Sequence, residues 1–134
     1  MLRTDGDIAG AVLAATPYSG VDVLMGVGGI PEGIIAACAI RSLGGAMLGR
    51  LAPQSDDERA TCRAAGLDLQ QVFTANDLVS SEEMFFTATG ITDGPLLTGV
   101  RYQGNQAETH SLLLRCETHT RRQIYAEHLL EETA

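Results

Sequence analysis

The residues best suited to chemistry follow a glycine-rich turn in the first quarter of the chain. Residues 21–33 read VDVLMGVGGIPEG, so an apolar run leads into three glycines and then into Pro-Glu-Gly. Pro31 suits the start of a helix, because its missing N–H would have no partner inside the helix. Glu32 would then lie beside free backbone amides, which bind phosphate groups at helix N-termini. The pattern therefore predicts a carboxylate and several amide donors around one point, which suits phosphate or a cation-bridged phosphate.

A second acidic group, Asp5-Gly6-Asp7, stands at the start of another expected helix. A carboxylate at such a place has a purely structural explanation, since the helix dipole and capping stabilise it by roughly 0.3–1 kcal/mol. The glycines are more numerous than capping needs, which favours close approach of a ligand to the backbone. Mg²⁺ and Mn²⁺ commonly bind through one or two carboxylates together with a substrate phosphate. The residues alone leave capping and ligand binding open, and they name no substrate.

Hydrophobic spacing predicts the elements that position these two turns. Apolar residues at helical spacing predict a helix over residues 7–15, and an almost wholly apolar stretch predicts a buried helix over residues 31–43. The apolar run of residues 21–25 predicts a buried strand between them. A short strand is expected over residues 46–51, and a serine followed by three acidic residues predicts a helix over residues 55–65.

The last third of the chain has the alternation typical of antiparallel strands. Strands are expected over residues 84–88, 97–102, 108–115 and 121–129, with turns at residues 92–95 and 104–105. The whole chain, residues 1–134, therefore reads as a single α/β domain, in which alternating helices and strands are followed by a β-rich C-terminal meander.

Composition narrows the functional classes. The chain has 134 residues, enough for one domain with a core, and its net charge of −8 argues against nucleic acid or an anionic membrane as a partner. No apolar run approaches the roughly 20 residues of a membrane span. The N-terminal residues lack the basic start and long apolar segment of a secretion signal, so we expect a cytoplasmic location. All nine basic residues are arginines, which excludes a Schiff-base or P-loop lysine in this chain.

The spacing of the cysteines and histidines predicts no metal or redox site. The cysteines lack the spacing of a zinc site or redox pair and are expected to be buried or incidental thiols: Cys38, Cys62 and Cys116. The histidines are spaced too far apart for a metal-binding pair on one helix and are expected on the surface or on edge strands: His110, His119 and His128. Arg121 and Arg122 are expected to be solvated charges on opposite faces of one strand.

Five fragments share their order and spacing with one known family. They are TDGDIAGAV (residues 4–12), GVGGIPEG (26–33), RSLGGAMLGRL (41–51), FTATGITDGPLLTGVRY (86–102) and THSLLLR (109–115). Together they resemble the class II fructose-1,6-bisphosphatases, which include cyanobacterial enzymes that also accept sedoheptulose-1,7-bisphosphate. The resemblance covers nearly the whole chain. It implies an α/β lobe of the layered sandwich found in lithium-sensitive sugar phosphatases.

The resemblance also implies roles for residues in both acidic turns. In the family, Asp-Gly-Asp contacts the sugar phosphate substrate, which corresponds here to Asp5, Gly6 and Asp7. The second glycine of the pair before Pro-Glu also contacts substrate and corresponds to Gly29. The glutamate of that motif binds the catalytic Mg²⁺ or Mn²⁺ and corresponds to Glu32. The resemblance assigns no catalytic residue to this chain. Ile30 stands where relatives often have alanine, a change that leaves Glu32 in place.

The main departure from the family is length. Members are more than twice as long, and the half that precedes this region supplies the other acidic metal ligands and the basic groups that hold phosphate. This chain therefore resembles the C-terminal lobe of an enzyme that hydrolyses the C1 phosphate of fructose-1,6-bisphosphate. One carboxylate, Glu32, does not make a multi-metal clamp. We expect the chain alone to hydrolyse the substrate very slowly or not at all, and to associate with the missing N-terminal lobe or with further copies of itself.

Two other interpretations stay open at this point. The chain could be a non-catalytic module that keeps the fold and binds a sugar phosphate or a nucleotide, or that serves as an assembly subunit. It could equally be a piece of a longer protein whose function is that of the parent. The sequence does not choose between fructose and sedoheptulose bisphosphates. Metal-dependent binding of a sugar bisphosphate would favour the enzyme over the module.

Overall fold

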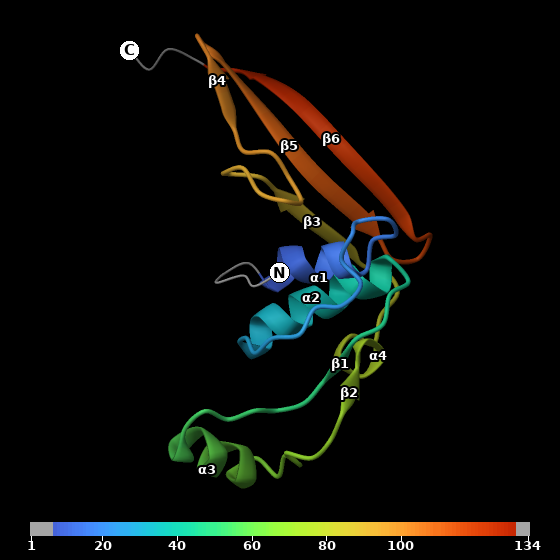
Figure 1. Ribbon diagram of the computed structural model, residues 1–134, viewed down its shortest axis with the longest axis vertical. Coiled ribbons are helices and arrows are strands. Elements are labelled where there is room, and N and C mark those ends of the chain that lie inside the picture. The colour runs from blue at the N-terminus through green and yellow to red at the C-terminus, as the bar shows by residue number, and fades with distance from the viewer. Residues whose placement is uncertain (1–6, 131–134) are drawn as a thin grey trace.

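A computed structural model describes residues 7–130 of the chain (Figure 1). A pair of helices lies at the middle, a sheet extends toward one end, and a thin arm extends toward the other. In chain order the elements are α1 (Asp7–Ala14), α2 (Ile30–Ser42), β1 (Leu48–Gly49), α3 (Asp56–Ala64), β2 (Phe73–Thr74), α4 (Ala75–Leu78), β3 (Phe85–Thr89), β4 (Arg101–Gln103), β5 (Gln106–Arg115) and β6 (Thr120–Leu129). Within residues 7–130, no helix has the length and apolar character needed to cross a bilayer.

The two central helices pack closely through small residues. Ala11 of α1 lies in one buried cluster with Ala36 and Ile40 of α2. Both helices have their N-terminal ends on the same side of the molecule (Figure 1). At the other end, a Cβ added to Gly45 would lie 2.9 Å from the Cβ of Ala15, so only glycine allows the chain to pass there. The predicted helices over residues 7–15 and 31–43 are therefore confirmed, each to within a residue or so of its ends.

The antiparallel sheet is built around β5. On one edge β5 pairs with β6 along its whole length, and on the other it pairs with β3 and β4, which lie end to end. Leu112 and Leu114 of β5 are almost completely buried and share a core cluster with Val12 of α1 and Ala39 of α2. Burying a leucine side chain is worth roughly 1.5–3 kcal/mol, so this contact fixes the helix pair to the sheet. The predicted strands over residues 84–88, 108–115 and 121–129 are confirmed.

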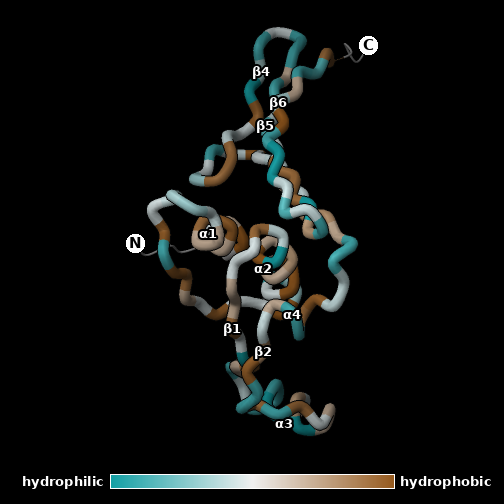
Figure 2. The backbone as a smooth tube through the Cα atoms, turned by 90° about the vertical axis from the view of Figure 1, so that its right-hand side faces the viewer, coloured by the Kyte–Doolittle hydropathy of each residue, from teal (hydrophilic) through white to brown (hydrophobic). Residues whose placement is uncertain are grey.

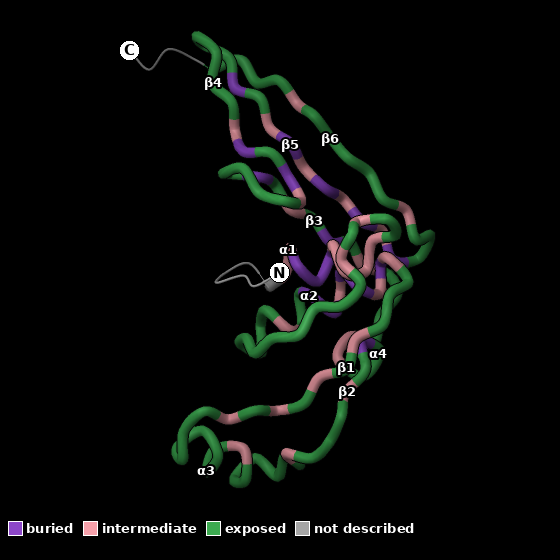
Figure 3. Tube along the Cα trace, viewed as in Figure 1, coloured by how far each residue is buried: buried purple, intermediate pink, exposed green. Residues whose placement is uncertain are grey.

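The helices cover only part of the sheet. Figure 3 shows buried residues concentrated in α1, α2 and along β5, whereas β6 is mostly exposed. Figure 2 shows the same division in hydropathy, with hydrophobic residues gathered in the helix pair and hydrophilic ones in α3. None of the residues of α3 is buried. The arm formed by residues 48–74 is therefore held mainly by the short pairing of β1 with β2 and by local hydrogen bonds.

Helix capping in the arm follows the sequence signals. The Oγ of Ser55 accepts a hydrogen bond from the N–H of Glu58 at 3.2 Å, as the predicted helix over residues 55–65 requires. In α4, Thr74 and Asp77 form a reciprocal capping box. The hydrogen bond from the Thr74 N–H, followed by that from its hydroxyl, lowers the pKa of the Asp77 carboxyl. Both helix starts are thus closed by their own side chains.

One predicted element is wrong. Residues 21–29 form no strand and lie mostly exposed, with Met25 89% exposed. Leu24 rests against Gly10 of α1, but the backbone has no neighbouring strand to pair with among the described residues. A run with the composition of a buried strand becomes one only where a partner strand is present. The strands expected over residues 46–51 and 97–102 are confirmed in part, as β1 and β4, and are shorter than predicted.

Candidate functional site

The N-terminus of α2 is an open helix start. Gly29 precedes the helix in an extended conformation, with φ −68° and ψ 157°, and no side chain caps the helix there. The first helical hydrogen bond runs from the N–H of Gly33 to the carbonyl of Gly29 at 3.0 Å. The N–H groups ahead of that bond have no partner inside the helix. The predicted arrangement of free amides beside Glu32 is therefore present in the structure.

Glu32 folds back over Gly29. Its carboxylate occupies the space that a Cβ at position 29 would need, and its Cδ lies 3.3 Å from that point. Glu32 is exposed to solvent. A carboxylate near a helix N-terminus is stabilised by the dipole. Gly29 therefore has a specific role, which is to leave room for the Glu32 carboxylate beside the open amides.

The start of α1 lies at the same end of the helix pair. Asp7 is one turn before Ala11, and Glu32 is one turn before Ala36, which packs in one cluster with Ala11. The backbone of Asp7 and the first turn of α2 are thus brought to one side of the molecule (Figure 1). The side chain of Asp7, together with Asp5 and Gly6, lies outside the described residues.

The described residues supply no cluster of further metal ligands beside Glu32. Within residues 7–130, no group of three or more His, Cys, Asp or Glu side chains is arranged to hold a metal ion. A shallow hollow beside β3 is lined by Glu83, Met84, Phe85, Arg115 and Glu117, away from the start of α2. In that hollow Arg115 lies 5.6 Å from the Phe85 ring centre and pairs with Glu117, so its charge is already satisfied.

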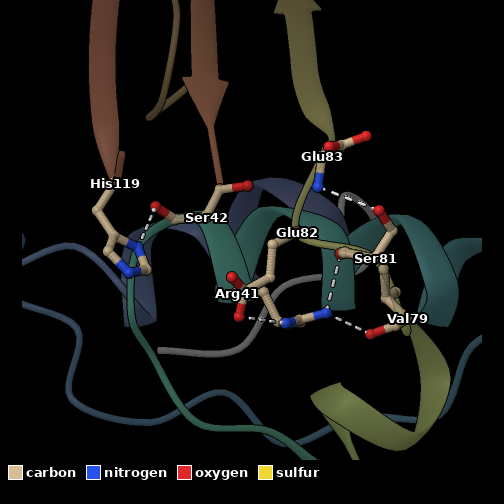
Figure 4. Close-up of polar contacts among 7 residues, drawn as sticks. All are labelled: Arg41, Ser42, Val79, Ser81, Glu82, Glu83 and His119. Carbon is tan, nitrogen blue, oxygen red and sulfur yellow. Dashed lines mark hydrogen bonds and ion pairs between the residues drawn. The ribbon is translucent and has the colours of Figure 1, made fainter. Parts of the chain in front are cut away.

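The C-terminal end of α2 is joined by side-chain hydrogen bonds to segments that are distant in sequence (Figure 4). Nη1 of Arg41 donates to the carbonyls of Val79 and Ser81, the latter at 3.0 Å, and its Nη2 lies 3.4 Å from Oε1 of Glu82. Nδ1 of His119 donates to the carbonyl of Ser42 at 3.3 Å. Arg41 is only 11% exposed. These contacts fix the helix whose other end presents Glu32.

No local sequence signal indicates this role for Arg41. A basic residue in the last turn of a helix is expected from the dipole alone, as in α3 with Arg63. Only the fold shows that residues 79–82 return beneath α2 and offer two carbonyls to the guanidinium.

The prediction of surface histidines is wrong for His110, which is buried. Its Nδ1 accepts from the N–H of Thr98 at 3.1 Å, so Nε2 carries the hydrogen and donates to Oε1 of Gln123 at 2.6 Å. Its ring stacks on Tyr125 with centroids 4.3 Å apart. The signal was available in the sequence, because His110 shares the alternation of Leu112 along β5. His119 and His128 are exposed, as predicted.

The remaining polar residues that the sequence singled out are structural. Asp93 accepts from the guanidinium of Arg101 at 2.8 Å and from the N–H of Gly99 at 2.9 Å, and these hydrogen bonds lower the pKa of its carboxyl. The chain does reverse direction in this loop, but at residues 94–97 rather than at the predicted residues 92–95, because the N–H of Gly94 donates to the carbonyl of Leu97 at 2.9 Å. The cysteines are free thiols, and burial, followed by the nearby thiol of Cys116, raises the pKa of Cys38.

Comparison with known proteins shows the family of this chain. Residues 1–128 match the family described as bacterial fructose-1,6-bisphosphatase, glpX-encoded. The chain belongs to this family. It is 42% identical over 141 residues to a protein of Haemophilus influenzae named fructose-1,6-bisphosphatase class 2, an alignment that covers 96% of this chain. It is 41% identical over 140 residues to fructose-1,6-bisphosphatase 1 class 2 of Escherichia coli, covering 95% of this chain.

These relatives are much longer than the matched region. The chain spans about 42% of the length of each of them. The family resemblance read from the five sequence fragments is confirmed.

Proposed function

We propose that the chain is part of a cytoplasmic, metal-dependent sugar bisphosphatase that hydrolyses the C1 phosphate of fructose-1,6-bisphosphate. Sedoheptulose-1,7-bisphosphate is a second candidate substrate. The observation that carries the proposal is the open start of α2, where the Glu32 carboxylate lies over Gly29 beside unpartnered amides. Family membership over residues 1–128 supports the same reaction class.

Each predicted site residue has a place in this proposal. The amides at the start of α2 donate to a phosphate oxygen, and Gly29 permits close approach of the substrate. Asp5, Gly6 and Asp7, at the positions that match the family motif, are assigned contacts with the sugar phosphate. The exposed carboxylate of Glu32 suits Mg²⁺ or Mn²⁺, which prefer oxygen ligands. Such an ion polarises a phosphoryl group and stabilises the leaving oxygen when bound.

The site needs more groups than Glu32 to be complete. We assign the remaining ligands to the part of the relatives that this chain does not match, and residues 1–134 to a C-terminal lobe with the layered sandwich of lithium-sensitive sugar phosphatases. The exposed apolar residues of the 21–29 segment, among them Val23, Met25 and Val27, support this assignment. They have the composition of a buried strand and would be covered where the other lobe supplies a neighbour.

Complementation tests this proposal. The chain alone should release no measurable phosphate from fructose-1,6-bisphosphate with Mn²⁺. Addition of the unmatched N-terminal portion of the Haemophilus influenzae relative should restore phosphate release, and Glu32→Gln should abolish it. Glu83→Gln, a carboxylate change away from the start of α2, is the matched control. Turnover by the chain alone at roughly 1–10³ per second, or restored activity that survives Glu32→Gln, would overturn the proposal.

A second candidate function is a non-catalytic module that binds a sugar phosphate or serves in assembly. The observation that favours it is that Glu32 has no companion ligands among the described residues. Binding of sugar bisphosphate that is unaffected by Mn²⁺ and by Glu32→Gln would support this module over the enzyme.

A further inference from the structure

Among residues 7–130, no strand pairs with the outer edge of β6. On its inner edge, β6 pairs with β5 from Gln106↔Leu129 to Arg115↔Thr120. The N–H of Leu130 donates to the carbonyl of Asn105 at 2.8 Å. Because hydrogen-bonding direction alternates along a strand, even-numbered residues of β6 face β5 and odd-numbered residues face outward. The backbone groups of residues 121, 123, 125, 127 and 129 are therefore available to another strand.

Apart from its charged residues, this edge lacks the features that usually protect an edge strand. The register with β5 runs without a bulge for ten residues, and the strand contains no proline. Ile124, Tyr125 and Leu129 are exposed, Tyr125 by 72%. Long, regular edges with apolar side chains pair readily with another chain. The edge is thus built for strand addition.

The charges on β6 point to a specific partner. Glu127 lies opposite Glu108 of β5, a like-charge pair that disfavours the sheet. Neither Glu127 nor Arg121 takes part in an ion pair among the described residues. Both lie on one face of the strand, and each is three residues from Ile124. A strand that offered a positive charge opposite Glu127 and a negative charge opposite Arg121 would satisfy both.

We propose that β6 pairs antiparallel with β6 of a second copy of this chain, about a two-fold axis at Ile124. This register places Arg121 opposite Glu127 of the second copy, and the symmetry repeats the pair at the other end. The outward-facing backbone groups of residues 121, 123, 125 and 127 then exchange hydrogen bonds across the axis. Moving the axis by one residue would place Arg121 opposite Tyr125 or Leu129 instead, so charge selects this register. The two sheets join into one, independently of the function proposed above.

Charge exchange tests the register in the full 134-residue chain. Sedimentation equilibrium should give a dimer for the unmodified chain. Arg121→Glu and Glu127→Arg should each raise the dimer dissociation constant by about tenfold or more, because each places like charges opposite one another twice. The double variant should restore the dimer. A monomeric unmodified chain, or a double variant no better than the single ones, would overturn the proposal. Far-UV circular dichroism checks that each variant is folded.

A crosslink provides a second, independent measurement. Ile124 would face its own copy in a non-hydrogen-bonded pair, with Cα atoms about 4.5 Å apart, which is within reach of a disulfide. Ile124→Cys should therefore form a covalent dimer on mild oxidation. Gln123→Cys is the matched control, because residue 123 would face Tyr125 of the second copy. Equal crosslinking of the two variants, each measured above the background of the unmodified chain and its own thiols, would contradict the axis at Ile124.

Discussion

The two ends of α2 differ in how their polar groups are satisfied. At the C-terminal end, Arg41 binds two carbonyls and Glu82 while His119 binds the carbonyl of Ser42. At the N-terminal end, no side chain caps the helix and Glu32 lies over Gly29 in solvent. The chain has effective caps elsewhere, at Ser55 and Thr74. The open end is therefore particular to α2, which is anchored at one end and uncapped at the other.

Removal of the anchor should have the largest effect on stability. Arg41→Ala leaves the carbonyls of Val79 and Ser81 without their donor, which should lower the free energy of unfolding by about 1–3 kcal/mol. Urea unfolding followed by circular dichroism measures this change. Arg63→Ala, at the exposed end of α3, is the control and should change stability by a few tenths of a kcal/mol. Equal effects of the two variants would mean that Arg41 is not an anchor.

Substitution at the open end should separate binding from folding. Gly29→Ala keeps an allowed extended backbone, but its Cβ displaces the Glu32 carboxylate. We expect Mn²⁺-dependent binding of fructose-1,6-bisphosphate to weaken by about tenfold, or about 1.4 kcal/mol, with little change in the unfolding free energy. Calorimetric titration and urea unfolding measure the two quantities. Gly33→Ala, where a Cβ meets nothing within 4 Å, is the control. Unchanged binding in Gly29→Ala would mean that the position of the Glu32 carboxylate is unimportant.

Loss of the hydrogen bond that links the β5–β6 turn to α2 should lower the free energy of unfolding by a smaller amount. His119→Ala removes one hydrogen bond to the carbonyl of Ser42, which should cost about 0.5–1.5 kcal/mol. Urea unfolding measures this change. An unfolding free energy equal to that of the unmodified chain would show that the long contact to Ser42 contributes nothing.

The smallest effect is expected at the capped start of α4. The lowered pKa of Asp77 means that its contribution to stability is present above its ordinary value of 3.8 and is lost as the pH falls through the lower folded value. Melting temperatures of the unmodified chain and of Asp77→Asn should therefore differ near neutrality and converge in acid. Parallel melting curves over the whole pH range would show that the capping box does not contribute.

Local signals predicted α1, α2 and α3 and the strands β5 and β6, because spacing and caps act over short distances. The turn at Gly104 between β4 and β5, with φ 61°, and the cap at Ser55 are such signals. The strand expected over residues 21–25 failed because its pairing depends on a neighbour that the described residues do not supply. The anchoring of Arg41 depends on a contact about forty residues away in sequence, which no local pattern encodes.

For the candidate site, the sequence placed Glu32 and Gly29 correctly at the start of α2, since a proline after a glycine pair marks that start. It did not reveal that the carboxylate turns back over the glycine. Asp5 and Gly6 stay predictions, because they lie outside the described residues, and so does the role of the Asp7 side chain.

Titration of the chain with fructose-1,6-bisphosphate, with and without Mn²⁺, tests the central claim most directly. The open start of α2 predicts binding that requires Mn²⁺ and that Glu32→Gln abolishes while the fold is unchanged. Binding that is equal in the Glu32→Gln variant, or that does not need Mn²⁺, would contradict the account of Glu32 as a metal ligand.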